Sequence, residues 1–313
     1  MNWSDFEIKG DNPPGEDHYI LKPCLRILFY FQGSVLTAGG DIMHFYSRAL
    51  PLIKQDSKYH LKPFKARYGS NGYMQLSKNN KKTFDYVEEY LAGKVGGVQF
   101  GILLETTDNP YGISDKALEI FHASCWDFGY VSLTLPVDYF GSDFEKCTAL
   151  THDLIADLPF KTGYVGYAVN VAFEDQRIRR YESSPFFHLS RKYLGVDFRL
   201  PYEFVRFENP MHSSHFDGKL TNVSWITYLH KSFADAVQFP KDEGVKALTL
   251  PRGTGFRAAP SPSVLPVTDR EAIKPYRRLA KQLEQFGLSK TMIERWDVIG
   301  GEKNTKWWME RFR

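Results

Sequence analysis

The residues best suited to holding a metal ion are His212 and His215, whose spacing of three is compatible with one side of a helical turn. Asp217 and Glu208 lie close by in the sequence and could add a carboxylate. A catalytic zinc ion takes three protein ligands and a water, so His212, His215 and Asp217 would make a metal-dependent hydrolase. A proline and a glycine flank this segment, which indicates a loop, and loop histidines are more often solvated than metal-bound. The hydrolase therefore stays the alternative function.

Two further chemical motifs fail on their context. Residues 253–258 (GTGFRA) fit G-x-G-x-x-A, but a dinucleotide site needs a helix directly afterwards, and the next residues, 259–262, are APSP. We therefore predict a β-hairpin turn there. The carboxylate and lysine of a metal-dependent nuclease are matched only by Glu7 and Lys9, before the first predicted strand. With no G-x-S-x-G elbow either, the sequence predicts no catalytic residues, no cofactor and no enzyme.

The elements that would carry these motifs alternate irregularly between strands and helices. Apolar runs rich in β-formers predict strands over residues 25–31, 98–104, 129–135, 163–173, 222–229, 245–251 and 253–258. Helical spacing and capping signals predict helices over 38–53, 81–92, 142–158, 182–194, 231–237 and 268–286, and one that starts between 114 and 119. The order is not strictly βαβ, so we predict an α+β fold with mixed, largely antiparallel sheets packed with helices.

Composition and charge set the broad class. The chain has 313 residues, of which 42% are hydrophobic and 25% charged, and these values allow a single domain over residues 1–313. The net charge of +3 is too small to indicate nucleic-acid binding and argues against a simple polyanionic DNA mimic. We expect a protein partner, with no direct nucleic acid and no small-molecule substrate.

The cysteines and the N-terminus indicate where the protein works. Cys24, Cys125 and Cys147 form no C-x-x-C pair, which is typical of a reduced, cytosolic chain. Residues 1–7 lack the basic and apolar regions of a signal peptide. Residues 25–31 are too short to span a bilayer. The sequence therefore predicts a cytoplasmic protein with no membrane partner.

Several short segments, taken in order, resemble the TsiV-type immunity proteins of type VI secretion systems. They are 25–31 (LRILFYF), 126–136 (WDFGYVSLTLP), 163–168 (GYVGYA), 223–229 (VSWITYL), and 253–262 leading into 276–280 (YRRLA). The resemblance spans roughly residues 20–286 and leaves 287–313 as a C-terminal extension. It implies a protein that is made beside a toxic effector, often one with a VRR-NUC nuclease domain, a metal-dependent DNase. Such a protein binds and inhibits the effector and so protects the producing cell.

Because the chain is slightly basic, we expect it to inhibit by steric occlusion of the nuclease rather than by imitating DNA. Two loops carry the carboxylates and turn residues suited to such contacts. The candidate effector-binding residues are Glu105, Asp108, Asn109 and Tyr111 in the first loop, and Glu208, His212, His215 and Asp217 in the second. The C-terminal residues 305–313, which contain Trp307 and Trp308, are predicted to dock back on the protein.

Overall fold

The computed structural model describes most of the chain. The described residues are 3–10, 18–33, 35–54, 60–61, 64–65, 74–75, 81–94, 99–107, 113, 115–123, 128–171, 185–198, 220, 223–237, 244–287 and 301–312. Their helices are η1 (Trp3–Phe6), α1 (Val35–Lys54), α2 (Lys81–Leu91), α3 (Phe144–Leu154), α4 (Pro185–Lys192), α6 (Lys231–Ala234), α7 (Arg270–Gln282), η5 (Glu284–Phe286) and α9 (Glu302–Met309). Their strands are β1 (Ile8–Gly10), β2 (His18–Gln32), β3 (His60–Leu61), β4 (Phe64–Lys65), β5 (Met74–Gln75), β6 (Gln99–Thr107), β7 (Ala117–Ala123), β8 (Phe128–Leu135), β9 (Phe160–Val171), β10 (Ile226–His230), β11 (Lys246–Leu250) and β12 (Gly253–Arg257).

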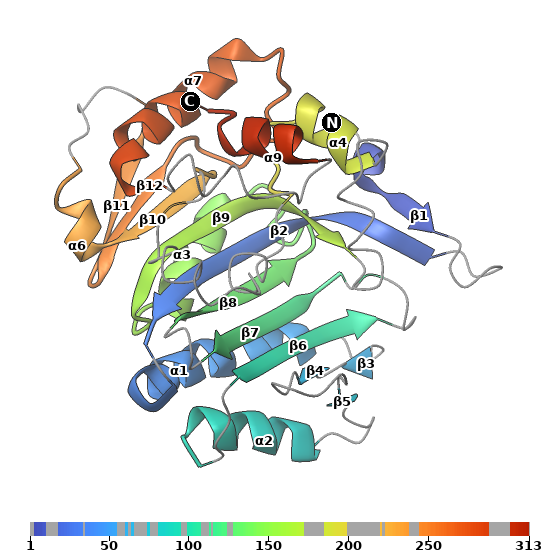
Figure 1. Ribbon diagram of the computed structural model, residues 1–313, viewed down its shortest axis with the longest axis vertical. Helices are drawn as coiled ribbons and strands as arrows, with labels where there is room; N and C mark the ends of the chain where they lie inside the picture. Colours follow the sequence, from blue (N-terminus) through green and yellow to red (C-terminus); the bar gives the residue numbers. More distant parts are fainter. Residues whose placement is uncertain are drawn as a thin grey trace.

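One large sheet runs through the molecule (Figure 1). Its strands follow the order β11-β12-β10-β9-β2-β8-β7-β6-β3, with β1 added beside β2, while β4 and β5 form a separate pair. Every pairing between these strands is antiparallel. The long strand β2 lies in the middle, between β8 and β9. The predicted α+β class with largely antiparallel sheets is confirmed.

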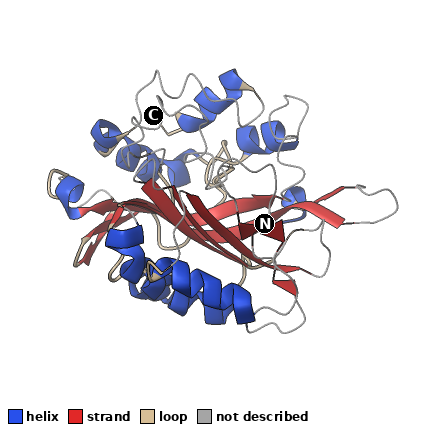
Figure 2. Cartoon of the chain, turned by 60° about the horizontal axis from the view of Figure 1, so that its bottom comes forward, coloured by secondary structure: helices blue, strands red, loops and turns tan. Residues whose placement is uncertain are grey.

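Helices cover both faces of this sheet, as Figure 2 shows. The alternation of side chains along β2 explains why, because successive residues point to opposite faces. Phe29 and Phe31 belong to the hydrophobic core beneath α1, α2 and α3. Leu28 and Tyr30 belong to a second core beneath α4, α7 and α9. We call these two sides of the molecule the α1 face and the α7 face.

Amphipathic patterning fixes how each helix lies on its face. On α7, Ile273, Tyr276 and Leu279 recur at spacings of three and are almost completely buried. On α1, Ile42 and Phe45 are buried in the same way, and Ala49 and Ile53 on the next turns are buried beside them. The predicted helices over 38–53 and 81–92 are confirmed with small shifts at their ends.

The hairpin of β11 and β12 occupies the place of the rejected dinucleotide motif. β12 pairs with β11 on one side and with β10 on the other, so the predicted β-hairpin is confirmed. Two glycines of β12 permit close packing. A Cβ atom on Gly253 would lie 2.2 Å from the carbonyl oxygen of Leu229, and one on Gly255 would lie 2.7 Å from the ring of Tyr228. These glycines therefore allow close packing within the sheet. In a dinucleotide-binding motif, glycines would instead allow the backbone to approach a pyrophosphate.

Two predictions about local structure are wrong. The helix expected to start between 114 and 119 is strand β7, because Leu118 and Ile120 face one core while Phe121 faces the other. The start of the helix predicted over 268–286 is also displaced. Asp269 is the N-cap of α7, and its carboxylate accepts a hydrogen bond of 3.1 Å from the Ala272 amide.

The C-terminal segment docks on the α7 face, as predicted. Trp308 in α9 is completely buried, and Phe312 is 2% exposed. Trp308 lies edge-on to Phe198, with 6.3 Å between ring centres, and Phe312 stacks on Tyr276 at 5.4 Å. The segment is therefore an integral part of this core.

Cys24 and Cys147 are buried and free of disulfide bonds. Within the described part of the chain, no helix combines the length and the apolar character needed to cross a membrane.

Candidate functional site

The first predicted binding loop begins later than expected. Glu105 lies within strand β6, where it pairs with Ala117 of β7, so the assignment of residue 105 to a loop is wrong. The strand continues to Thr107, because Thr106 and Thr107 pair with Leu61 and His60 of β3. Asp108, Asn109 and Tyr111 lie outside the described residues.

The second predicted loop, with Glu208, His212, His215 and Asp217, lies wholly outside the described residues. The proposed metal ligands of the alternative hydrolase belong to it. Among the residues that the structure does describe, no group of three or more His, Cys, Asp or Glu side chains is arranged to hold a metal ion.

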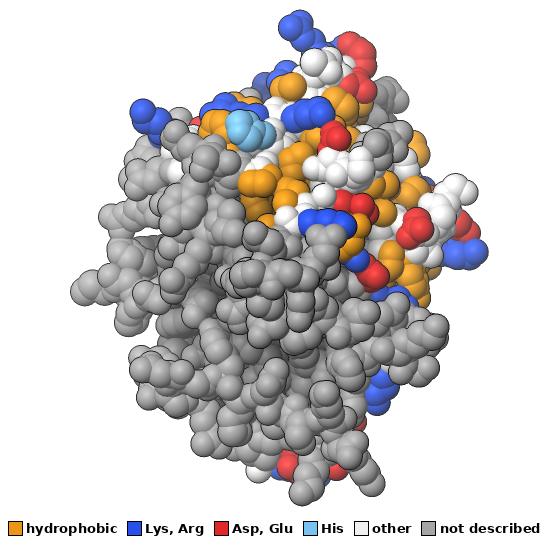
Figure 3. All heavy atoms as spheres, turned by 90° about the vertical axis from the view of Figure 1, so that its right-hand side faces the viewer, with side chains coloured by type: hydrophobic (Ala, Val, Ile, Leu, Met, Phe, Trp, Pro, Cys, Tyr) orange, Lys and Arg blue, Asp and Glu red, His pale blue; other side chains and the backbone are white. Residues whose placement is uncertain are grey.

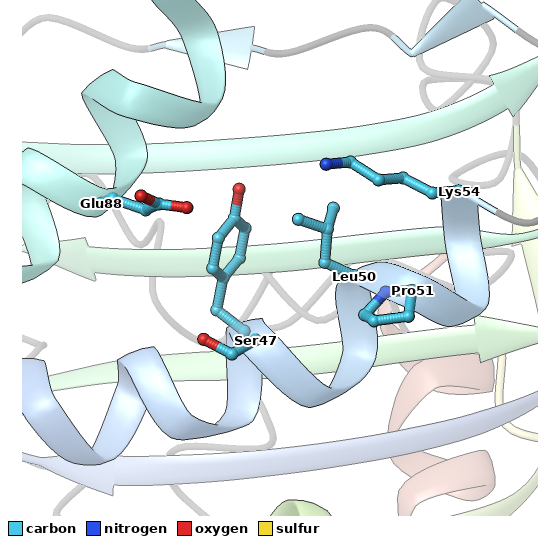
Figure 4. Close-up of a pocket in the computed structure, with 6 residues that line it drawn as sticks. Ser47, Leu50, Pro51, Lys54 and Glu88 are labelled. Atoms are coloured by element: carbon cyan, nitrogen blue, oxygen red, sulfur yellow. The ribbon is translucent and has the colours of Figure 1, made fainter. Parts of the chain in front are cut away.

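A groove lies between helices α1 and α2. Its volume is about 450 Å³. Five of its six lining residues come from α1 and one from α2, and they are Tyr46, Ser47, Leu50, Pro51, Lys54 and Glu88. Figure 4 shows Glu88 and Lys54 at opposite ends of the groove, with Leu50 between them. The groove therefore combines an apolar centre with opposite charges at its ends.

Two of these residues leave polar groups without their usual partners. Tyr46 is 1% exposed, and its hydroxyl has no hydrogen-bond partner among the described residues. Burial raises the pKa of this hydroxyl above its usual range and the Glu88 carboxylate raises it further, so Tyr46 stays protonated. Pro51 lies inside α1 and has no amide hydrogen, so the Ser47 carbonyl lacks its normal helical donor. The Tyr46 hydroxyl therefore lies enclosed behind the lining of the groove.

A second polar cluster lies on the α7 side of the sheet, around Glu119 of β7. Burial raises the pKa of the Glu119 carboxyl, while the charge of Arg26 and a hydrogen bond from Tyr130 act in the opposite direction. Arg26 is itself 4% exposed and donates a hydrogen bond of 2.7 Å to the Val169 carbonyl. One oxygen of Glu119, Oε2, is enclosed and accepts no hydrogen bond from the described residues. This cluster lies within the sheet layer and offers no surface for a macromolecule.

The helices on the two faces differ in charge, although the whole chain carries only +3. The helices of the α1 face are nearly neutral. They contain five basic residues (Arg48, Lys54, Lys81, Lys82, Lys146) and six acidic ones (Asp41, Asp85, Glu88, Glu89, Glu145, Asp153).

The helices of the α7 face are strongly basic. They contain nine basic residues (Arg191, Lys192, Arg270, Lys274, Arg277, Arg278, Lys281, Lys303, Lys306) and two acidic ones (Glu271, Glu302). In the side view of Figure 3, basic, acidic and hydrophobic side chains share the surface of the upper part. The low net charge thus conceals one strongly basic helical layer.

Comparison with known families gives the class of the protein. A family model described as type VI immunity for VRR-NUC matches residues 109–312, which makes this an immunity protein of the type VI secretion class. The chain belongs to the TsiV family. The match reaches residue 312. It therefore includes nearly all of residues 287–313, which lie beyond the segments that carry the resemblance in the sequence.

A solved structure gives the same fold. The chain is similar to the Pseudomonas aeruginosa T6SS protein PA0821, with a TM-score of 0.75 and 14% sequence identity. The similarity covers 98% of this chain and 87% of that protein. At this identity the likeness shows a shared fold. A comparison with curated protein sequences finds no match.

Proposed function

We propose that this protein binds a VRR-NUC nuclease effector of a type VI secretion system and blocks access to its active site or DNA-binding groove. The protein itself performs no chemistry in this proposal. Because the effector's substrate is DNA, the encounter takes place in the cytoplasm of the protected cell.

The observation that carries the proposal is the family match over residues 109–312, with its description as immunity for VRR-NUC. The matched region contains β7 to β12 and the helices of the α7 face, and so comprises much of the large sheet. A broad sheet with helices packed on both faces is a rigid body. Binding such a body costs little ordering entropy, which favours tight occlusion of a partner.

Co-expression with the neighbouring effector tests the proposal. Cells that express the effector's nuclease domain alone should die, and cells that also express this protein should grow. A catalytically inactive nuclease variant should still co-elute with the protein on gel filtration, which separates binding from toxicity. In a DNA-cleavage assay, added protein should stop cleavage once it equals the nuclease in amount. Continued killing together with the absence of a complex would refute the proposal.

A further inference from the structure

We propose that the groove between α1 and α2 is the surface that anchors the effector, and that its occupant is a segment of the nuclease domain with a basic side chain next to an apolar one. The inference rests on the proposed function, since it names the surface through which the same inhibition occurs. The groove of about 450 Å³ has room for a few side chains, as expected for the anchoring centre of a larger interface.

The apolar side chain of the occupant is inferred from the apolar residues that line the groove. Leu50 is 8% exposed and forms the centre of the lining, and Pro51 lies exposed beside it. An apolar side chain of the nuclease bound there would be removed from water and would contact both Leu50 and Pro51. Anchors of this kind supply much of the affinity of protein interfaces.

Tyr46 shapes the wall of the groove and takes no part in the polar contact. Its hydroxyl is enclosed and has no partner among the described residues, so a partner on the surface does not reach it.

The basic side chain follows from the charges on α2. Asp85, Glu88 and Glu89 are exposed on this helix. Glu88 also lines the groove. A nuclease binds the phosphates of DNA with Lys and Arg, so the rim of its active site offers the cations that these carboxylates would attract.

The opposite side of the molecule is unsuited to the same contact. Nine basic and two acidic residues on α4, α7 and α9 would repel a basic DNA-binding groove. The α1 face therefore turns toward the nuclease.

The extent of the family match supports this choice. Residues 109–312 match the family, and both α1 and α2 lie before that region. A surface that recognises one particular effector belongs outside the part that the family shares, since each member must distinguish its own partner.

Calorimetric titration of the full chain into a catalytically inactive nuclease domain, at about 0.15 M salt, tests the groove. Glu88→Lys should weaken binding about tenfold or more, because it places a cation against a cation. Glu88→Gln should also weaken binding, by about threefold or more, because it removes the charge and keeps the size of the side chain. Glu88 is exposed, so neither substitution should lower the urea unfolding midpoint. Loss of binding by these variants therefore reports on the contact and not on misfolding.

The matched control is Arg277→Glu, a charge reversal at an exposed position of α7 on the opposite face. It should bind like the wild type, within about twofold. If the wild type binds and both groove variants bind equally well, the groove proposal is wrong while the proposed function stands. Weakening by Arg277→Glu that exceeds the effect of Glu88→Lys would also overturn it. If the wild type does not bind the nuclease, the proposed function fails, and the groove proposal fails with it.

Discussion

Arg311 ties the end of the chain to Leu194, because its Nε donates a hydrogen bond of 2.6 Å to the Leu194 carbonyl oxygen. The guanidinium carbon also lies 3.7 Å from the centre of the Trp308 ring. Asn304 adds a second link between the two segments, since its side-chain amide donates a hydrogen bond of 3.0 Å to the Ser190 hydroxyl. These buried contacts fix α9 against α4 and make the last residues part of the α7 face.

Trp308→Ala should therefore unfold the protein much more easily. Its side chain is completely buried, and loss of a buried tryptophan costs about 3–5 kcal/mol. Urea unfolding followed by circular dichroism measures the change. Lys303→Ala, at an exposed position of the same helix, should change the unfolding free energy by less than about 0.5 kcal/mol. Equal effects of the two substitutions would show that α9 does not pack as described.

The C-terminal docking and most strands were predictable from local sequence. Residues 25–31 are a nearly continuous run of large apolar and aromatic side chains in which Arg26 is the one charged residue, as expected for a strand covered on both faces. Strand β7 was mistaken for a helix because Leu118 and Phe121 also fit helical spacing. The neighbouring strands β6 and β8 decide between the two patterns, and a single short segment contains no information about them.

A pair of glycine substitutions should have opposite effects on stability. Gly253→Ala should destabilise the protein by about 2 kcal/mol or more, because its Cβ would lie 2.2 Å from the Leu229 carbonyl oxygen and force the sheet apart. Gly40→Ala, in helix α1, meets no atom within 4 Å and should stabilise by about 0.5–1 kcal/mol. Urea unfolding midpoints of both variants test this. A Gly253→Ala variant as stable as the wild type would contradict the packing of β12 against β10.

The groove could not be predicted from sequence for a related reason. Tyr46, Leu50 and Pro51 lie on successive turns of a predicted helix, while Glu88 lies on another, and only tertiary packing brings these helices together. One local signal was available. A proline near the end of a predicted helix removes a backbone hydrogen bond, and Pro51 does so at the groove. The two predicted loops were chosen for composition, which says nothing about which surfaces form a hollow.

The final prediction concerns pH. Burial raises the pKa of the Glu119 carboxyl, so the folded protein holds this proton more tightly than the unfolded chain. The proton-linked stability is fully present below the unfolded pKa and is lost as pH rises through the folded pKa. Glu119→Gln removes this titration. The stability of the wild type relative to Glu119→Gln should therefore fall between about pH 4 and pH 8.

Urea unfolding of both proteins at the two pH values measures this difference. Glu88→Gln, a substitution of the same type at an exposed position of α2, is the matched control. A relative stability that rises with pH in the Glu119 comparison would mean that the attraction of Arg26 exceeds the cost of burial. Arg26 would then stabilise the ionised carboxylate, and Glu119 would strengthen the sheet at neutral pH instead of weakening it.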